Sequence, residues 1–220
     1  MLTSELLDQN IPRLHLSDTV VKAKQLISDF NLSHLPVVSE NKFIGLISEE
    51  DLLDVEDSKI TIDLIQDSFL NVAIPENIHF LNAINFCNQY ESNIVPIIDS
   101  NKTFMGAVSS TTLLKVIGEF SGANEIGGII VIETEMINFS ISEISRIVES
   151  NNSTILHLNT NSNKLSGKLI VTLHVNNREL SSILSTFERF KYNVIYHFGA
   201  TLIEDDTDFN YRNLMKYLDI

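Results

Sequence analysis

The sequence predicts an α+β protein in which two repeats of βαββα type are followed by a domain of βαββαβ order. Three observations support this prediction. A pattern of apolar and polar residues occurs twice in the first 120 residues, about 60 positions apart, and the pattern changes after Gly127-Gly128. Charge is also uneven, because residues 1–126 contain 7 basic and 18 acidic side chains whereas the rest contain 8 and 11.

Each repeat starts with an amphipathic helix and a buried strand. Apolar residues recur at three- and four-residue spacing in residues 20–30 and again in residues 80–90. The apolar strands Leu35-Pro36-Val37-Val38 and Val95-Pro96-Ile97-Ile98 follow at the same distance. We therefore expect two copies of one helix and strand unit.

A polar turn and a glycine-containing strand complete each copy. The strands Ile44–Ser48 and Met105–Ser109 pair with the preceding strands as hairpins, and each leads into a second helix that contains two leucines. Agreement of four elements in the same order is not expected by chance. The repeat therefore predicts two similar structural units.

These residues resemble the CBS domain family in the apolar-Pro-Val-Val strand and in the segment Gly45-Leu46-Ile47-Ser48-Glu49-Glu50-Asp51. The resemblance covers roughly residues 1–120. It implies that both repeats pack with pseudo-two-fold symmetry into one disc-like CBS pair, or Bateman module. It also implies that clefts between the repeats bind adenosine-containing ligands such as AMP, ATP or S-adenosylmethionine.

Ser48 and Asp51 allow two interpretations. In a capping box, Ser48 accepts a backbone N–H at the helix start and Asp51 complements the helix dipole. In a ligand site, Ser48 contacts a phosphate and Asp51 accepts the hydroxyls of a ribose, as the resemblance implies. The expected ligand-binding residues are Gly45, Ile47, Ser48, Asp51, His34 and Pro36.

Three of these expectations concern the shape and the walls of the pocket. Gly45 lets a ligand approach the backbone closely. Strand residues around His34, Leu35, Pro36 and Ile47, with the segment 61–72, form the apolar adenine pocket. His34 is either a base contact or a partly buried structural histidine.

The second copy differs at one position of the motif. Gly106 and Ser109 match the first copy, but Thr112 stands where the carboxylate is expected. A neutral hydroxyl makes weaker hydrogen bonds than a charged carboxylate. We therefore expect a weak or empty second site formed by Gly106, Ser109 and Thr112.

The remaining chain reads as strand, helix, two strands, helix and strand, the ferredoxin-like order. It resembles an ACT domain, and a CBS pair followed by such a domain resembles the regulatory proteins of acetoin utilisation. The turn 133–140 lacks the glycine that amino-acid-binding ACT domains usually have, so we expect pairing with another chain rather than amino-acid binding. The expected parts are CBS repeat 1 (1–60), CBS repeat 2 (61–125), the ACT-like domain (126–202) and an acidic tail with a short helix (203–220).

Composition and motifs exclude several classes of function. A net charge of −14 disfavours nucleic acid and anionic membrane partners. A signal-peptide pattern and a membrane-length apolar run are absent, which predicts a cytoplasmic protein. Cys87 lies in an apolar stretch and is expected in the core. The six histidines lack metal-ligand spacing, and glycine-rich nucleotide motifs are absent, so we expect neither an enzyme nor an obligatory cofactor or metal.

The leading hypothesis is a regulatory module that senses an adenine nucleotide and acts on an unidentified protein. The acidic first half favours ligands with few phosphates, AMP before ATP. The alternative is a structural adaptor that mediates oligomerisation and whose CBS clefts are vestigial. In either case we expect a homodimer.

Overall fold

The computed structural model describes residues 1–163 and 166–199, which divide into two compact units. The first unit comprises Met1–Ile117, and the second begins at Gly118. Both units combine helices with sheets, which confirms the α+β class. The expected acidic tail with its short helix, residues 203–220, lies outside the described residues.

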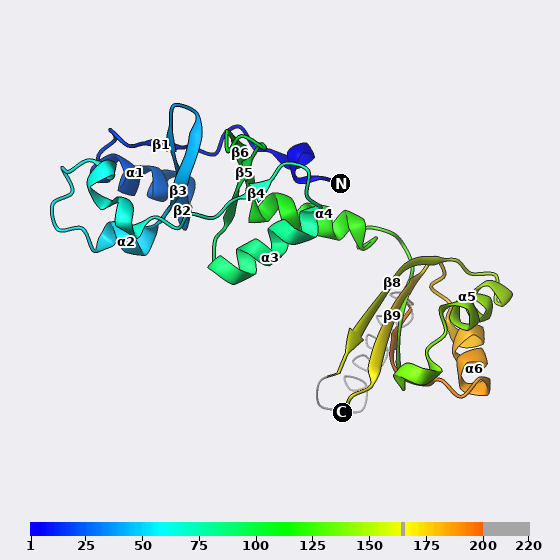
Figure 1. Ribbon diagram of the computed structural model, residues 1–220. Helices are drawn as coiled ribbons and strands as arrows, with labels where there is room; N and C mark the ends of the chain where they lie inside the picture. Colours follow the sequence, from blue (N-terminus) through cyan, green and yellow to red (C-terminus); the bar gives the residue numbers. More distant parts are fainter. Residues whose placement is uncertain (164–165, 200–220) are drawn as a thin grey trace, which may run out of the picture. The chain divides into compact units, whose positions relative to one another are not determined.

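The first unit contains two copies of a βαββα motif (Figure 1). The first copy is formed by β1 (Leu14–His15), α1 (Val20–Phe30), β2 (His34–Ser39), β3 (Lys42–Ser48) and α2 (Glu49–Leu53). The second copy is formed by β4 (Ile74–Pro75), α3 (Phe80–Tyr90), β5 (Ile94–Ile98), β6 (Phe104–Ser109) and α4 (Ser110–Phe120). Two 3-10 helices, η1 (Thr3–Leu6) and η2 (Ile62–Ser68), precede the copies.

The two copies share strand pairing and irregularities. In the first sheet β1 pairs with β2 in parallel and β2 with β3 antiparallel, and β4, β5 and β6 repeat this arrangement. A register shift occurs at the same place in each hairpin, between Val37 and Val38 and between Ile97 and Ile98. The internal repeat in the sequence is thus a repeat in structure.

The helices begin and end where local chemistry requires it. The Thr19 side chain accepts the Lys22 N–H and so caps the start of α1. Helices α1 and α3 end at Asn31 and Glu91, which adopt left-handed φ values of 51° and 50°. The apolar faces of both helices contribute to one hydrophobic core shared by the two repeats.

A segment between the repeats joins the edge of the first sheet. Leu46 and Leu70 exchange two backbone hydrogen bonds of 2.9 and 2.8 Å, so residues after η2 continue the sheet beside β3. The segment approaches Gly45 so closely that an added Cβ would lie 2.8 Å from the Cβ of Phe69. This approach brings residues 68–70 next to the start of α2.

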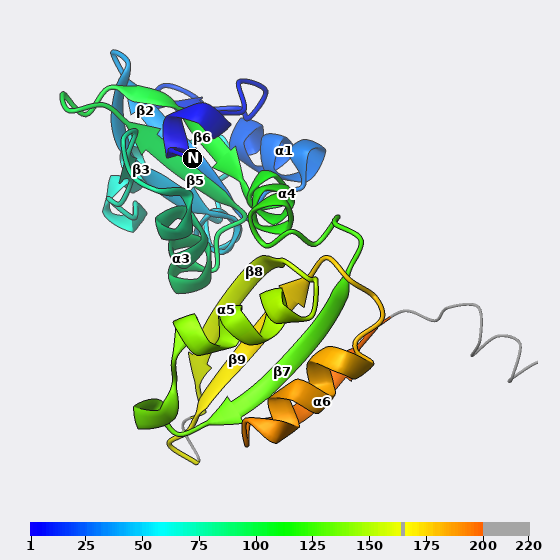
Figure 2. The same ribbon diagram turned by 90° about the vertical axis from the view of Figure 1, so that its right-hand side faces the viewer.

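The second unit is a four-stranded antiparallel sheet with two helices on one face (Figure 2). Its elements are β7 (Gly128–Thr134), η3 (Met136–Asn138), α5 (Ile141–Ser150), β8 (Ile155–Ser162), β9 (Leu169–Val175), α6 (Ser181–Arg189) and β10 (Asn193–Phe198). The strand order β10-β7-β9-β8 accompanies the βαββαβ order of elements. Helix α6 starts later than expected, because Asn177 accepts the Glu179 N–H in a turn before the helix.

Cys87 packs partly buried against the core of the first unit, and burial raises the pKa of its thiol. Among the described residues, the helices are too short or too polar to span a bilayer.

Candidate functional site

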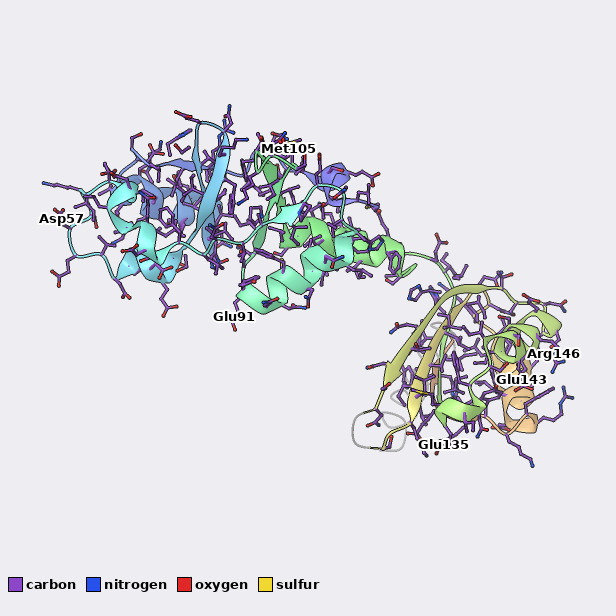
Figure 3. The ribbon with its side chains drawn as sticks, viewed as in Figure 1. Asp57, Glu91, Met105, Glu135, Glu143 and Arg146 are labelled. Atoms are coloured by element: carbon purple, nitrogen blue, oxygen red, sulfur yellow. The ribbon has the colours of Figure 1, made fainter. Side chains whose placement is uncertain are left out.

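A cavity of about 550 Å³ lies beside the start of α2 in the first unit. Its walls come from the first residues of β2, the first turn of α2, residues 68–70 and the C-terminal end of α3. Glu91 marks that end of α3 in Figure 3. The cavity thus combines elements of both repeats with the segment between them.

Ser48 and Asp51 form a reciprocal capping box at the start of α2. The Asp51 N–H donates to Ser48 Oγ over 3.0 Å, and Asp51 Oδ2 accepts from the Ser48 hydroxyl and from the Ser48 N–H. The other carboxylate oxygen, Asp51 Oδ1, accepts no hydrogen bond from the described residues. The side chain therefore caps the helix and keeps one charged acceptor for a ligand.

Few backbone N–H groups at this helix start remain for a phosphate. The Glu49 N–H donates to the Ser33 carbonyl over 2.9 Å, and the Asp51 N–H is used by Ser48. Glu50 alone of these three donates no hydrogen bond within the described part of the chain. Three consecutive carboxylates in the first turn also oppose an incoming anion. The expected contact of Ser48 with a phosphate therefore finds little support in this geometry.

His34 is held by a hydrogen-bond network that joins the two repeats. The Ser33 hydroxyl donates to Asn93 Oδ1 over 3.1 Å and accepts the Asn93 N–H over 2.9 Å. His34 Nδ1 lies 3.0 Å from the Ser33 hydroxyl, and which of the two donates depends on the tautomer of the ring. Burial lowers the pKa of His34 and outweighs the opposing charge of Asp51, which keeps the ring neutral at pH 7.

The structure brings together three of the expected ligand-binding residues. Ser48, Asp51 and His34 line the cavity, as do residues 68–70 of the expected segment 61–72. No motif in the sequence points to Tyr90 or Glu91, which also line it. The only signal for them is the repeat itself, because it places the end of α3 at a position equivalent to the end of α1.

The other three expected residues do not line this cavity. Gly45 faces Phe69, so its missing side chain makes room for the protein's own segment rather than for a ligand. Ile47 is 0% exposed and Pro36 is buried as well, because both belong to strands inside the core.

Carboxylates dominate the charge of the cavity. The side chains of Glu49, Glu50, Asp51 and Glu91 line it, and lysine and arginine are absent from its lining. Glu49, Glu50 and Glu91 are exposed and Asp51 is partly buried, so their charges act on a ligand within the cavity but are screened beyond about 8 Å. The cavity therefore favours neutral or cationic ligands over multiply charged anions.

The second copy reproduces the cap without the carboxylate. The Thr112 N–H donates to Ser109 Oγ over 3.1 Å, and the two hydroxyls lie 2.9 Å apart. Gly106 precedes this cap in β6 and adopts a φ of 144°, a conformation that favours glycine. The capping function is thus common to both copies, and the free carboxylate oxygen is particular to the first.

Sequence comparison supports a domain assignment for the first repeat. Residues 4–58 match the family model described as the CBS domain. A homoserine O-acetyltransferase from Methanococcus vannielii is 25% identical over 124 residues, which cover 53% of this chain. The matched region spans about a quarter of that enzyme, so its activity does not transfer to this chain.

Solved structures with similarity to this chain include several CBS proteins. A CBS domain pair/ACT domain protein from Thermotoga maritima is 20% identical with a TM-score of 0.49, and the match covers 55% of this chain and 98% of that one. A Vibrio cholerae protein assigned to acetoin utilization is 16% identical with a TM-score of 0.46, covering 56% and 95%. CBSX2 in complex with AMP is 16% identical with a TM-score of 0.46, covering 54% and 97%. The similarity to the CBS-domain family model is confined to residues 4–58 of this chain.

Proposed function

We propose that this chain is a cytoplasmic regulatory protein whose first unit binds an adenosine-containing ligand in the cavity beside α2. The observation that carries the proposal is the unused Asp51 Oδ1 at a cavity of about 550 Å³, a size typical of small-molecule sites. The CBS domain at residues 4–58 supports the same ligand class.

The lining offers a partner for each part of adenosine. Asp51 Oδ1 accepts a ribose hydroxyl in a charge-assisted hydrogen bond. The neutral His34 forms a hydrogen bond with the edge of the base through Nε2, as donor or acceptor according to its tautomer. Phe69, Leu70 and Tyr90 supply apolar surface for the rings.

Charge ranks the ligands within this class. Each phosphate added to adenosine meets four carboxylates and finds no lysine or arginine in the lining. We therefore propose that AMP binds more tightly than ATP when Mg²⁺ is absent. A ligand with a positive centre, such as S-adenosylmethionine, gains affinity from the same carboxylates.

A thermal-shift experiment tests the proposal directly. Adenosine, AMP, ATP and S-adenosylmethionine are added without Mg²⁺ to the full chain. Ligand at about 100 times its dissociation constant adds roughly 2.7 kcal/mol to the free energy of unfolding. A melting temperature that none of the four ligands raises would contradict the proposal, and tighter binding of ATP than of AMP would contradict the electrostatic ranking.

One observation favours the alternative of a structural adaptor. Ser48 and Asp51 satisfy each other in the capping box, so both have a role in the absence of any ligand. If this is their whole role, replacing Asp51 changes only stability. The mutations in the Discussion separate the two functions.

Association into a homodimer is part of the proposal. Leu53 on α2 and Leu114 on α4 occupy equivalent positions of the two repeats, and both are exposed, at 65% and 71%. Burial of such side chains against another copy removes apolar surface from water. Light scattering at micromolar concentration should give the dimer mass, and a monomer mass would refute this part.

For the second unit we propose an ACT-like domain that pairs with another chain rather than binding amino acids. Its βαββαβ order supports the assignment, and the glycine-free turn after β7 forms the short helix η3. Calorimetry that detects saturable binding of an amino acid would overturn it.

A further inference from the structure

A second and larger cavity, of about 630 Å³, lies elsewhere in the first unit. Residues of α3 and of the segment 71–78 before it line the cavity. Phe43 and Lys102, from the hairpins of the two repeats, line it as well. Ser48, Asp51 and His34 do not line this cavity, and Tyr90 is the one residue that both cavities share.

The polar groups of this cavity are unusual for so acidic a chain. Four carboxamide side chains line it, together with one lysine and no aspartate or glutamate: Asn71, Asn82, Asn85, Gln89 and Lys102. The rest of its lining is apolar apart from the Tyr90 hydroxyl. The cavity thus differs from the one beside α2, which four carboxylates line.

Several of these polar groups have no protein partner. Asn71, Asn85 and Lys102 are exposed at the rim of the cavity and make no side-chain hydrogen bond or ion pair with the described residues. The Asn82 amide donates to the His79 carbonyl over 3.2 Å, which leaves its oxygen as an acceptor. The cavity therefore presents donors, acceptors and one positive charge that the fold does not use.

At two of the three amide positions of α3 the first repeat has a charged residue instead. Lys22 and Asp29 are equivalent to Asn82 and Gln89, with Asp18 at the position of Ile78, whereas Gln25 is equivalent to Asn85 and is also a carboxamide. Asp18 and Lys22 form an ion pair of 2.7 Å on the surface of α1. This helix face thus carries an ion pair in the first repeat, whereas in the second repeat Asn82 and Gln89 are neutral and each donates one side-chain hydrogen bond.

We propose that the second cavity binds a small planar heterocycle that carries ring amide groups and one anionic substituent. A carboxamide offers a donor and an acceptor side by side, which matches the N–H and C=O pairs of such a ring. Lys102 attracts the anionic group, and no carboxylate in the lining repels it. Apolar residues such as Val72 and Ile74 cover the faces of the ring.

Isothermal titration calorimetry of the full chain tests the proposal with three probes. Orotate combines ring amides with a carboxylate, uracil keeps the ring amides without charge, and 1-methylnicotinamide carries a positive charge. Saturable binding should be tightest for orotate, weaker by about tenfold for uracil and absent for 1-methylnicotinamide. Failure of both orotate and uracil to bind, or tighter binding of the cation, would overturn it.

Matched variants show where the probe binds. Asn85→Ala and Lys102→Asn should each weaken orotate binding about tenfold, and asparagine tolerates the left-handed φ of 60° at position 102. Asn88→Ala, on the same helix but outside the lining, and Lys115→Ala, on α4, are the controls and should bind as the wild type does.

Asp51→Thr separates this proposal from the adenosine site, because it alters the cavity beside α2 alone. It should leave orotate binding unchanged. Loss of orotate binding in Asp51→Thr with no loss in Lys102→Asn would assign the probe to the other cavity and refute the inference.

Discussion

Replacing Asp51 with threonine distinguishes ligand binding from helix capping, because the protein already contains the resulting arrangement. In the second repeat Thr112 donates its N–H to Ser109 and places its hydroxyl 2.9 Å from the serine hydroxyl. Asp51→Thr copies this cap and removes the unused oxygen Oδ1. The start of α2 should therefore remain capped while the charged ligand contact is lost.

The structure sets the expected magnitudes. Loss of one hydrogen bond to a charged acceptor costs about 1.5–3 kcal/mol, which is a factor of about ten to a hundred or more in affinity. The free energy of unfolding should change by less than about 0.5 kcal/mol, since the backbone capping bond persists. Asp51→Ala also loses the contact between the Ser48 and Asp51 side chains and should unfold more easily by about 0.5–1 kcal/mol.

Calorimetry with adenosine, AMP and S-adenosylmethionine measures the affinity, and urea denaturation without ligand measures stability. Glu56→Gln is the control, because it changes the net charge by the same amount at an exposed residue outside the cavity. If Asp51→Thr binds these ligands as tightly as Glu56→Gln, Asp51 does not hold the ribose. If wild type binds none of them, the capping box is the whole role of this motif.

The remaining predictions concern four single substitutions. Thr112→Asp should create a second binding event in the same calorimetry. It should also raise the free energy of unfolding by about 0.3–1 kcal/mol, because α4 has no acidic residue in its first turn. Gly45→Ala should destabilise the protein by about 1–3 kcal/mol, because the added methyl group collides with Phe69. Gly118→Ala, which has open space around it, should stabilise the protein by about 0.5–1 kcal/mol. The midpoints of urea denaturation test both predictions. In the folded chain the pKa of His34 is lowered from its ordinary value of 6.5, so protonation of this side chain favours the unfolded chain. Wild type should therefore lose stability as the pH falls below about 6.5, and His34→Gln should lose less. Denaturation at pH 7.5 and 5.5 tests this.

The repeat and its elements were predictable from sequence because they rest on local patterns. Apolar spacing in residues 20–30 and 80–90 defines the two helices, and the proline-containing strands mark the hairpins. The start of α6 was not predictable in the same way, because asparagine is a residue type that commonly caps helices and Asn177 was therefore expected to do so. In the structure its side chain accepts the N–H of Glu179 instead, and the helix begins only at Ser181.

The candidate site was predictable only in part, for a physical reason. Ser48 and Asp51 lie three residues apart, so their local geometry follows from the helix start. Tyr90 and Glu91 reach the cavity through tertiary packing of the other repeat, which a local motif does not encode. Gly45 shows a further limit of prediction from sequence. A glycine is needed both where a ligand approaches the chain closely and where another segment of the protein does, so its presence does not distinguish the two.

Net charge alone is a poor guide to what this chain binds, because charges act over short distances. At physiological ionic strength the interaction between exposed charges decays over about 8 Å, so the residues lining a cavity outweigh the total of −14. One cavity of the first unit has four lining carboxylates, and the other has one lysine, four carboxamides and no carboxylate. A phosphate or carboxylate on a ligand is therefore opposed at the first cavity and attracted at the second, although both belong to the more acidic part of the chain. An anionic ligand that bound the Asp51 cavity as tightly as its neutral analogue would refute this local account of charge.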